Sequence, residues 1–178
     1  MAKDTGLGEG VYFAQDAYSG LGRRFFIQAI DLAVLLVGSY ALGTGFFVVT
    51  NGDPVYFLWL LFGTWWGYLV LVESIVGTVG FWIAGVRIVD CRGQRPSILR
   101  MSGRFLLLLL GPFNPILDLF WVGSDAHRQT LRDKFAGTFV VKKGALPVGK
   151  GQIRARVYLI MGMTIAFAEI QHTDTATH

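Results

Sequence analysis

The chain has 178 residues, of which 53% are hydrophobic and 16% are charged, and its formal net charge is +4. Soluble domains carry about 25% charged residues, so this composition indicates a single-domain membrane protein rather than a soluble one. The basic residues flank apolar segments, which favours contact with anionic lipid and argues against nucleic-acid binding. The single cysteine, Cys91, excludes an intrachain disulfide and a cysteine-based metal site.

The first long apolar run extends from Phe25 to Val49, after a polar, glycine-rich segment at residues 1–22. A helix of this length rises about 37 Å, which exceeds the roughly 30 Å of a bilayer hydrocarbon core. Asp31 is the one charge in the run, and a carboxylate at such depth costs about 2.5–3.5 kcal/mol. Arg24 lies two helical turns earlier, so the two side chains share a face about 10 Å apart. The run predicts a transmembrane helix with a buried polar site.

The second span is predicted at Tyr56–Val72, which is just long enough to cross. Before it, Asn51–Pro54 predicts a tight turn in which Asp53 caps the helix and Pro54 takes the first helical position. Gly63 and Gly67 have the GxxxG spacing that lets helices approach closely. We expect these glycines to pack on the first helix of the same chain rather than to form a dimer motif.

Two short segments on either side of the third hydrophobic region predict a small cytoplasmic β element. Ser74–Gly85 is apolar and glycine-rich, and it predicts a short helix at the membrane surface. Val86–Asp90 alternates apolar and polar residues, which is typical of a strand. Thr138–Val141 is its expected strand partner.

The third hydrophobic region, residues 105–122, is interrupted by Gly111–Pro115, where two prolines force a kink or a break. The loop Thr50–Val55 has no lysine or arginine, whereas the segments before the first span and after the second span are basic. The N-terminus is therefore predicted to be cytoplasmic. A single crossing at 105–122 would place the many basic residues after it outside. A re-entrant or interfacial hairpin is therefore favoured over a crossing.

The remainder of the chain, residues 143–178, contains a fourth apolar stretch at Ala155–Ala168. Fourteen residues are few for a span, so this stretch predicts an interfacial or packed segment. Whether residues 105–122 and 155–168 cross the membrane stays open. Residues 23–142 form the predicted membrane domain.

The sequence offers no catalytic constellation. The histidines are His127, His172 and His178, and their spacing does not suit a metal site. No phosphate-binding glycine loop precedes a lysine. We therefore expect no enzymatic activity, no cofactor and no metal.

Several charged residues are expected on the cytoplasmic half of the membrane, because each lies near the cytoplasmic end of an apolar segment. This candidate polar cluster consists of Arg24, Asp31, Glu73, Arg104 and Asp133. Charges in membranes usually pair with one another, so the favoured interpretation is structural pairing, with convergence of Arg24, Asp31 and Asp133. The alternative is a group that carries an ion or a proton. Asp118 is expected to face water at a helix end, or otherwise to join the cluster.

Three segments in order resemble motifs of the RDD family of bacterial membrane proteins, which is named for one arginine and two aspartates. The segments are Gly22–Asp31, Gly77–Asp90 and Arg128–Val141, and the resemblance covers about residues 20–142. It implies that Arg24, Asp31 and Asp133 are the named triad. Arg132 departs from the family pattern, because many relatives have histidine before the aspartate. Ligand or ion transport is suggested for the family.

The sequence thus predicts a mainly α integral membrane protein with two full transmembrane helices, a proline-broken third hydrophobic region and a small β element. We expect a multi-pass protein of the cell inner membrane that acts as an accessory or scaffold subunit against other membrane proteins. Two spans leave little room for alternating access, and no internal repeat is visible. The alternative is a homo-oligomeric ion or proton transporter that uses Asp31.

Overall fold

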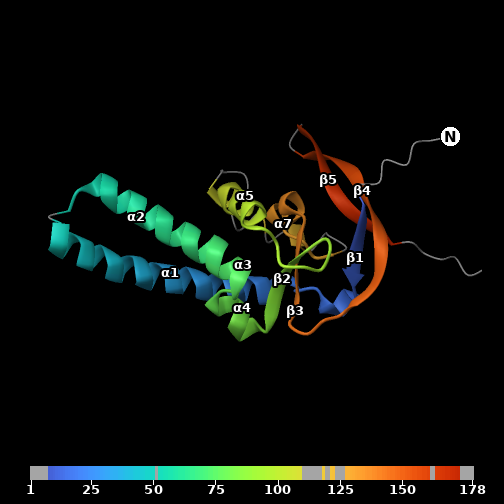
Figure 1. Cartoon of the computed structure of the whole chain (residues 1–178), viewed down its shortest axis with the longest axis horizontal. Coiled ribbons are helices and arrows are strands. Elements are labelled where there is room, and N and C mark those ends of the chain that lie inside the picture. The colour runs from blue at the N-terminus through green and yellow to red at the C-terminus, as the bar shows by residue number, and fades with distance from the viewer. Residues whose placement is uncertain are drawn as a thin grey trace, which may run out of the picture.

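The computed structural model of the chain is mostly helical, with two small sheets (Figure 1). It describes residues 8–50, 52–109, 118, 121–122, 127–160 and 163–172. Two long helices extend to one end of the molecule, while the short helices and both sheets gather at the other. The long helices and the compact end are therefore distinct regions of one chain.

The helical hairpin begins with α1, Leu21–Thr50, and continues with α2, Pro54–Trp66. The helix then widens into a π-helical turn, η2, at Gly67–Val72 and ends with α3 at Glu73–Ile75. The predicted helix start is confirmed, because the Asp53 side chain accepts a hydrogen bond of 2.8 Å from the Val55 amide and proline follows it.

Two stretches, Leu21–Val48 and Pro54–Ala84, are long and apolar enough to cross a membrane. Only 17% of the most apolar window of the first is buried within the chain, and 6% of that of the second. A core helix of a soluble protein would be mostly buried. The two helices instead present nearly bare apolar surfaces.

The strand pair predicted from alternation is confirmed. Strand β2, Val86–Asp90, pairs antiparallel with β3, Thr138–Lys142, and Ile88 lies opposite Val140. A six-residue helix precedes each strand: α4, Val79–Ala84, leads into β2, and α7, Leu131–Ala136, leads into β3.

These two helix–strand units form a structural repeat that was not visible in the sequence. Thr78 and Thr130 each cap a six-residue helix, and a left-handed glycine at φ 63° or 60° ends it before a five-residue strand. Ile88 and Val140 occupy equivalent positions and face each other. An approximate two-fold axis therefore passes between them. The repeat is not visible in the sequence, because the residues that the two units share are few and widely spaced.

The second sheet is formed by two parts of the chain for which no strands were predicted, the N-terminal segment and the segment after residue 143. Its strands β1, Glu9–Phe13, β4, Pro147–Ile160, and β5, Met163–His172, are antiparallel in the order β1-β4-β5. The described part of the apolar stretch 155–168 thus lies in strands β4 and β5, and it is packed on α7 through Phe167, which is 2% exposed. The stretch from Val157 to Met163 lacked the alternation that marks a strand.

The β2–β3 sheet is the middle layer of the compact end. One face, with Val89, Phe139 and Val141, packs against the three-stranded sheet. The other face, with Ile88 and Val140, packs against the helices α1, η2, α4 and α5. Both faces of these short strands are buried, which fixes their register.

Helix α5, Ile98–Leu109, opens the third hydrophobic region, and its Ser102 hydroxyl accepts a hydrogen bond of 3.2 Å from the Trp66 indole. The predicted turn at Gly111–Pro115 lies outside the described residues. The compact end therefore holds α5 against the base of α2.

Candidate functional site

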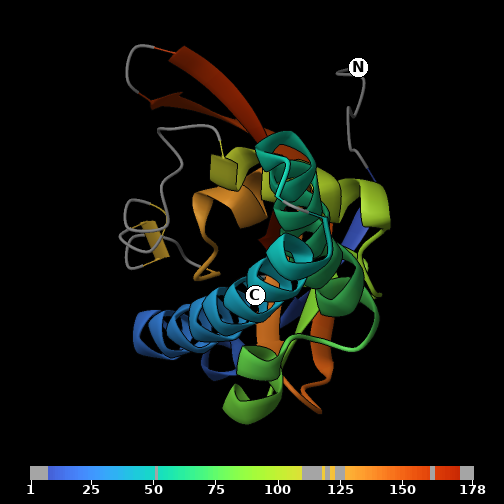
Figure 2. The same ribbon diagram turned by 90° about the vertical axis from the view of Figure 1, so that its left-hand side faces the viewer.

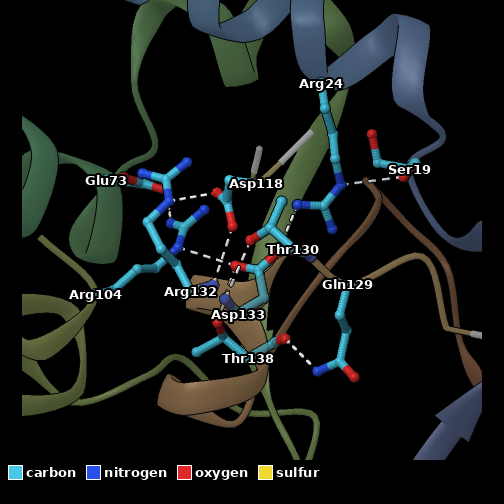
Figure 3. Close-up of polar contacts among 10 residues, drawn as sticks. All are labelled: Ser19, Arg24, Glu73, Arg104, Asp118, Gln129, Thr130, Arg132, Asp133 and Thr138. Atoms are coloured by element: carbon cyan, nitrogen blue, oxygen red, sulfur yellow. Dashed lines mark hydrogen bonds and ion pairs between the residues drawn. The ribbon is translucent and has the colours of Figure 1, made fainter. Parts of the chain in front are cut away.

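Four of the predicted cluster residues meet between the helical hairpin and the sheets (Figure 3). Arg24 comes from the first turn of α1, Glu73 from α3, Arg104 from α5 and Asp133 from α7. All four are buried. Residues distant in sequence are thus joined where the two regions of the molecule meet.

Asp133 is the centre of this network and is 0% exposed. Its Oδ2 lies 2.5 Å from Nη1 of Arg24, and its Oδ1 lies 2.9 Å from Nε of Arg104. The Arg24 contact is a hydrogen bond. The Arg104 contact is an ion pair only, because Nε of Arg104 has no hydrogen-bond partner among the described residues. Asp133 also completes a capping box with Thr130, which places the carboxylate at the start of α7.

Burial alone would raise the pKa of Asp133, but Arg104 and then Arg24 outweigh it and hold the pKa of that carboxyl well below its usual range. Burial would lower the pKa of Arg104, but Asp133 and Glu73 raise it above its ordinary value. Both groups therefore stay charged at neutral pH.

The chain of contacts continues from Arg104 to Glu73, which form a buried ion pair. Arginine and carboxylate alternate along Arg24, Asp133, Arg104 and Glu73, so the four formal charges cancel. Pairing of this kind offsets the desolvation of charges that would otherwise be prohibitive. The arrangement therefore explains how a charged network is buried here.

Asp118 does not face water, contrary to the favoured expectation. It is 1% exposed and forms an ion pair with the Arg132 guanidinium. It also accepts a hydrogen bond of 3.1 Å from the Arg132 amide. The carboxylate caps the N-terminal end of α7 from outside the helix.

Asp31 is buried in a separate polar site on α1, although the sequence grouped it with Arg24 and Asp133. It accepts hydrogen bonds from the Tyr68 hydroxyl at 2.9 Å, the Thr78 hydroxyl at 2.6 Å and the Gly80 amide at 2.8 Å. Among the described residues, Arg24 is not one of its partners. Two helical turns place side chains on one face of a helix, but the neighbouring elements decide which partners they find.

Asp31 and Asp118 have equivalent roles in the repeat. Gly80 and Arg132 are both the second residue of their helices, and each amide donates to one of these carboxylates. A Cβ atom at residue 80 would lie 2.6 Å from the Ile27 carbonyl oxygen, so glycine lets α4 approach α1. One carboxylate is therefore paired with an arginine, and the other is held by neutral donors.

A further buried ion pair, missed by the sequence analysis, joins Lys134 of α7 to Glu169 of β5. The Tyr158 hydroxyl donates to the same carboxylate, and burial followed by Glu169 raises the pKa of Tyr158. The rings of Phe135 and Phe167 pack edge to face beside it. These contacts fasten the β4–β5 hairpin to α7.

Within the described residues, no group of three or more histidine, cysteine, aspartate or glutamate side chains is arranged to hold a metal ion. The Ser19 hydroxyl and Nη2 of Arg24 are buried without a hydrogen-bond partner in that part of the chain. The site as described is a set of carboxylates bound by arginines, hydroxyls and amides.

A family model described as the RDD family matches residues 18–137. The chain belongs to the RDD family. The resemblance inferred from the three motifs is thus confirmed. Of the three residues that the resemblance assigns to the triad, Arg24 and Asp133 bind each other, and Asp31 anchors α4. No curated protein and no solved structure matches the chain.

The residues that sequence analysis missed carried weak signals. Thr130 and Asp133 have the spacing of a capping box, and Thr78 precedes a short apolar run in the same way. Tyr68 had no signal, because a tyrosine inside an apolar run is ordinary. Its position within the π-helical turn, which is frequent at functional sites, became visible in the structure alone.

Proposed function

We propose that this RDD protein is an integral membrane protein of the inner membrane that packs against other membrane proteins as an accessory or scaffold subunit. The α1–α2 hairpin would cross the bilayer, and the compact end would lie on the cytoplasmic side with the N-terminus. The family match and the two long apolar helices support the membrane placement.

The observation that carries the proposal is the open glycine face formed by Gly63 of α2 and Gly67 at the start of η2. A Cβ atom at Gly63 or Gly67 would meet no atom within 4 Å, whereas one at Gly43 would lie 3.2 Å from the Phe57 ring. The GxxxG pair therefore does not pack on α1, contrary to the prediction from sequence. Helix α2 contains no buried residue. A surface of this kind favours close contact with a helix of another chain.

The charged network also supports a structural role. Each charged group of the network is ion-paired with another member of it, along Arg24, Asp133, Arg104 and Glu73. Arg132 is likewise ion-paired with Asp118. A group that loads and releases cargo must be able to exchange its partner. Permanent pairs instead hold the hairpin on the sheets.

Substitution of the glycine face tests the proposal. Gly63→Ile with Gly67→Ile adds side chains that keep helices apart, so we expect loss of stoichiometric partners on purification from native membranes. Gly38→Ile is the matched control, because a Cβ atom there also meets nothing within 4 Å, but on α1. Native mass measurement would show the partner with the control and not with the double variant. Equal masses for wild type and double variant would overturn the proposal.

The second candidate is a homo-oligomeric ion or proton transporter that uses Asp31. It is favoured by one observation: Asp31 is a buried carboxylate whose described partners are neutral donors. A wild-type mass that is a multiple of this chain, without a foreign subunit, would support this alternative.

The proposed topology places Cys91 and the residues after β3 on the cytoplasmic side and Gly52 outside. An impermeant thiol reagent applied to intact cells should label Gly52→Cys in a Cys91→Ser background. It should label Cys91 only after lysis. Labelling of a cysteine at Leu146 from outside would place the sheets on the wrong side and refute the topology.

A further inference from the structure

Helix α4 and the turn before it present a bare apolar face at the junction of the two regions. The exposed apolar side chains of this face are Ile75, Val76, Val79, Trp82 and Ile83. Trp82 is 64% exposed and Ile83 is 61% exposed, while the opposite side of the helix packs on α1 through Gly80. These side chains, on α4, the end of α3 and the turn between them, are what we call the α4 face; the Trp82 indole also donates a hydrogen bond of 2.8 Å to the Val76 carbonyl.

The repeat shows how unusual this exposure is. Lys134 and Phe135 of α7 are the positions equivalent to Trp82 and Ile83. Lys134 is 4% exposed and paired with Glu169 of β5. Phe135 packs on Phe167 and is 39% exposed, less than Ile83. Figure 2 shows α4 and the strands of the β4–β5 hairpin on opposite sides of the molecule, and the hairpin contacts α7 through Glu169 and Phe167.

Lys143 borders the α4 face, and Arg87 lies near it, bonded to Ala145 two residues after Lys143. The Nζ atom of Lys143 lies 5.2 Å from the centroid of the Trp82 ring, and the Lys143 amide binds the Gly85 carbonyl at 2.8 Å. Arg87 is exposed at the start of β2 and donates one hydrogen bond of 2.9 Å, to the Ala145 carbonyl. Among the described residues, neither cation has a carboxylate within ion-pair distance, whereas Lys142 beside them is paired with Asp16. The border therefore carries uncompensated positive charge.

The depth of α4 along the hairpin matches a bilayer surface. Asp31 fixes the start of α4 to α1 at a point about 9 Å along the helix from Phe25, where the apolar run begins. An interfacial helix buries its apolar face about 5–10 Å into the boundary between headgroups and acyl chains. Tryptophan is enriched at that level, and lysine and arginine attract anionic headgroups there.

We infer that the α4 face is a docking surface for anionic phospholipids of the cytoplasmic leaflet, with Trp82 and Ile83 at the acyl boundary and Lys143 and Arg87 on the headgroup phosphates. This inference rests on the membrane insertion proposed above. It gives Asp31 a positioning role, because its hydrogen bonds to Thr78 and Gly80 hold α4 at the required depth.

Lipid retention by the full chain in detergent tests the inference. Wild type titrated with phosphatidylglycerol or phosphatidylcholine should retain the anionic lipid preferentially in native mass spectra. Lys143→Gln with Arg87→Gln should remove most of this preference, about fivefold for each cation. The control, Lys150→Gln with Arg154→Gln, removes the same charge from β4 and should leave it unchanged. Equal preference in the wild type and the test variant, or an equal loss in the control, would overturn the inference.

A second measurement keeps the test independent of the charges. In bilayers of brominated phosphatidylglycerol, Trp82→Phe should remove a quenched component of the tryptophan fluorescence; an unchanged quenched component would count against the α4 face. Alkaline carbonate extraction of native membranes separates the two levels of the argument. Extraction of the wild-type chain would refute membrane insertion itself, whereas an integrated chain without lipid preference would refute the docking surface alone.

Discussion

The α4–β2 and α7–β3 units share a threonine cap, a six-residue helix and a left-handed glycine, yet their surroundings differ. Helix α7 is enclosed by three arginine–carboxylate pairs and by the β4–β5 hairpin. Helix α4 is held by one carboxylate with neutral donors, and its outer face is bare. The same local unit thus forms the closed centre of the fold in one copy and faces the surroundings in the other.

This difference follows from single residues. The Arg132 guanidinium of α7 is the counter-ion of the Asp118 carboxylate, so the formal charges of this pair cancel. The equivalent Gly80 has no side chain, and α1 approaches closely instead. A close helix contact replaces an ion pair, and the α4–β2 unit is attached to α1.

The largest effect is expected from Asp133→Asn. The substitution leaves Arg24 and Arg104 buried beside a neutral amide, and breaking a buried ion pair by removing one partner costs about 3–5 kcal/mol. Thermal unfolding of the purified chain in detergent should show this loss. Asp16→Asn removes the exposed partner of Lys142 and serves as the control, with no measurable change expected. Equal midpoints for both variants would mean that the network does not stabilise the fold.

Asp31→Leu should destabilise α4 more than the rest of the chain. It leaves the Gly80 amide and the hydroxyls of Tyr68 and Thr78 without their acceptor, at about 1–3 kcal/mol for a buried unsatisfied group. Asp31→Asn keeps one acceptor oxygen and should cost less.

Amide hydrogen exchange resolves the effect by region. The Gly80 and Phe81 amides should lose protection in Asp31→Leu, while the Asp133 and Lys134 amides in α7 keep theirs. Loss of protection in both helices together would show that the two units are one cooperative element and would weaken the comparison between them.

Gly85→Ala and Gly137→Ala should have equal, smaller effects. Both residues have positive φ, and a Cβ atom at either meets nothing within 4 Å, so the cost is the left-handed backbone alone, about 1–2 kcal/mol. Chemical denaturation of each variant would measure it. Clearly unequal losses would show that the two glycines are not equivalent within the repeat.

Acid should produce the smallest change. The pKa of Asp133 is lowered in the folded chain, so the unfolded chain binds its proton first as the pH falls. Its contribution is therefore complete above the ordinary carboxyl pKa of 3.8 and is lost progressively below it. Unfolding midpoints between pH 7 and pH 3 should fall less steeply in Asp133→Asn than in wild type. Parallel curves would contradict this assignment.

Sequence patterns predicted the elements whose signals are local. Alternation marked Val86–Asp90, and the Asp53–Pro54 pair marked the start of α2. The common side of the membrane, read from the charge bias, grouped Arg24, Glu73, Arg104 and Asp133, which the structure brings together.

The missed features depend on contacts between distant segments. The partners of Asp31 come from η2 and α4, and the spacing from Arg24 carries no information on either. The stretch from Val157 to Met163 lacked alternation, and the short alternation at Ile153–Val157 was not recognised as a strand; the hairpin buries Ile153 and Ile170 in one cluster and packs Phe167 on Phe135. Gly63 and Gly67 had the right spacing for close packing, but the sequence did not show that their face lies away from α1.

Ion flux tests the central claim most directly, namely that Asp31 anchors α4 and is not a carrier. The purified chain and its Asp31→Asn variant are reconstituted in liposomes with an imposed pH gradient, and cation and proton movement is followed. The account predicts that wild-type liposomes dissipate the gradient no faster than empty ones and that the variant behaves the same. Robust flux through the wild type, abolished in a normally folded Asp31→Asn chain, would contradict the account and establish Asp31 as the carrier group.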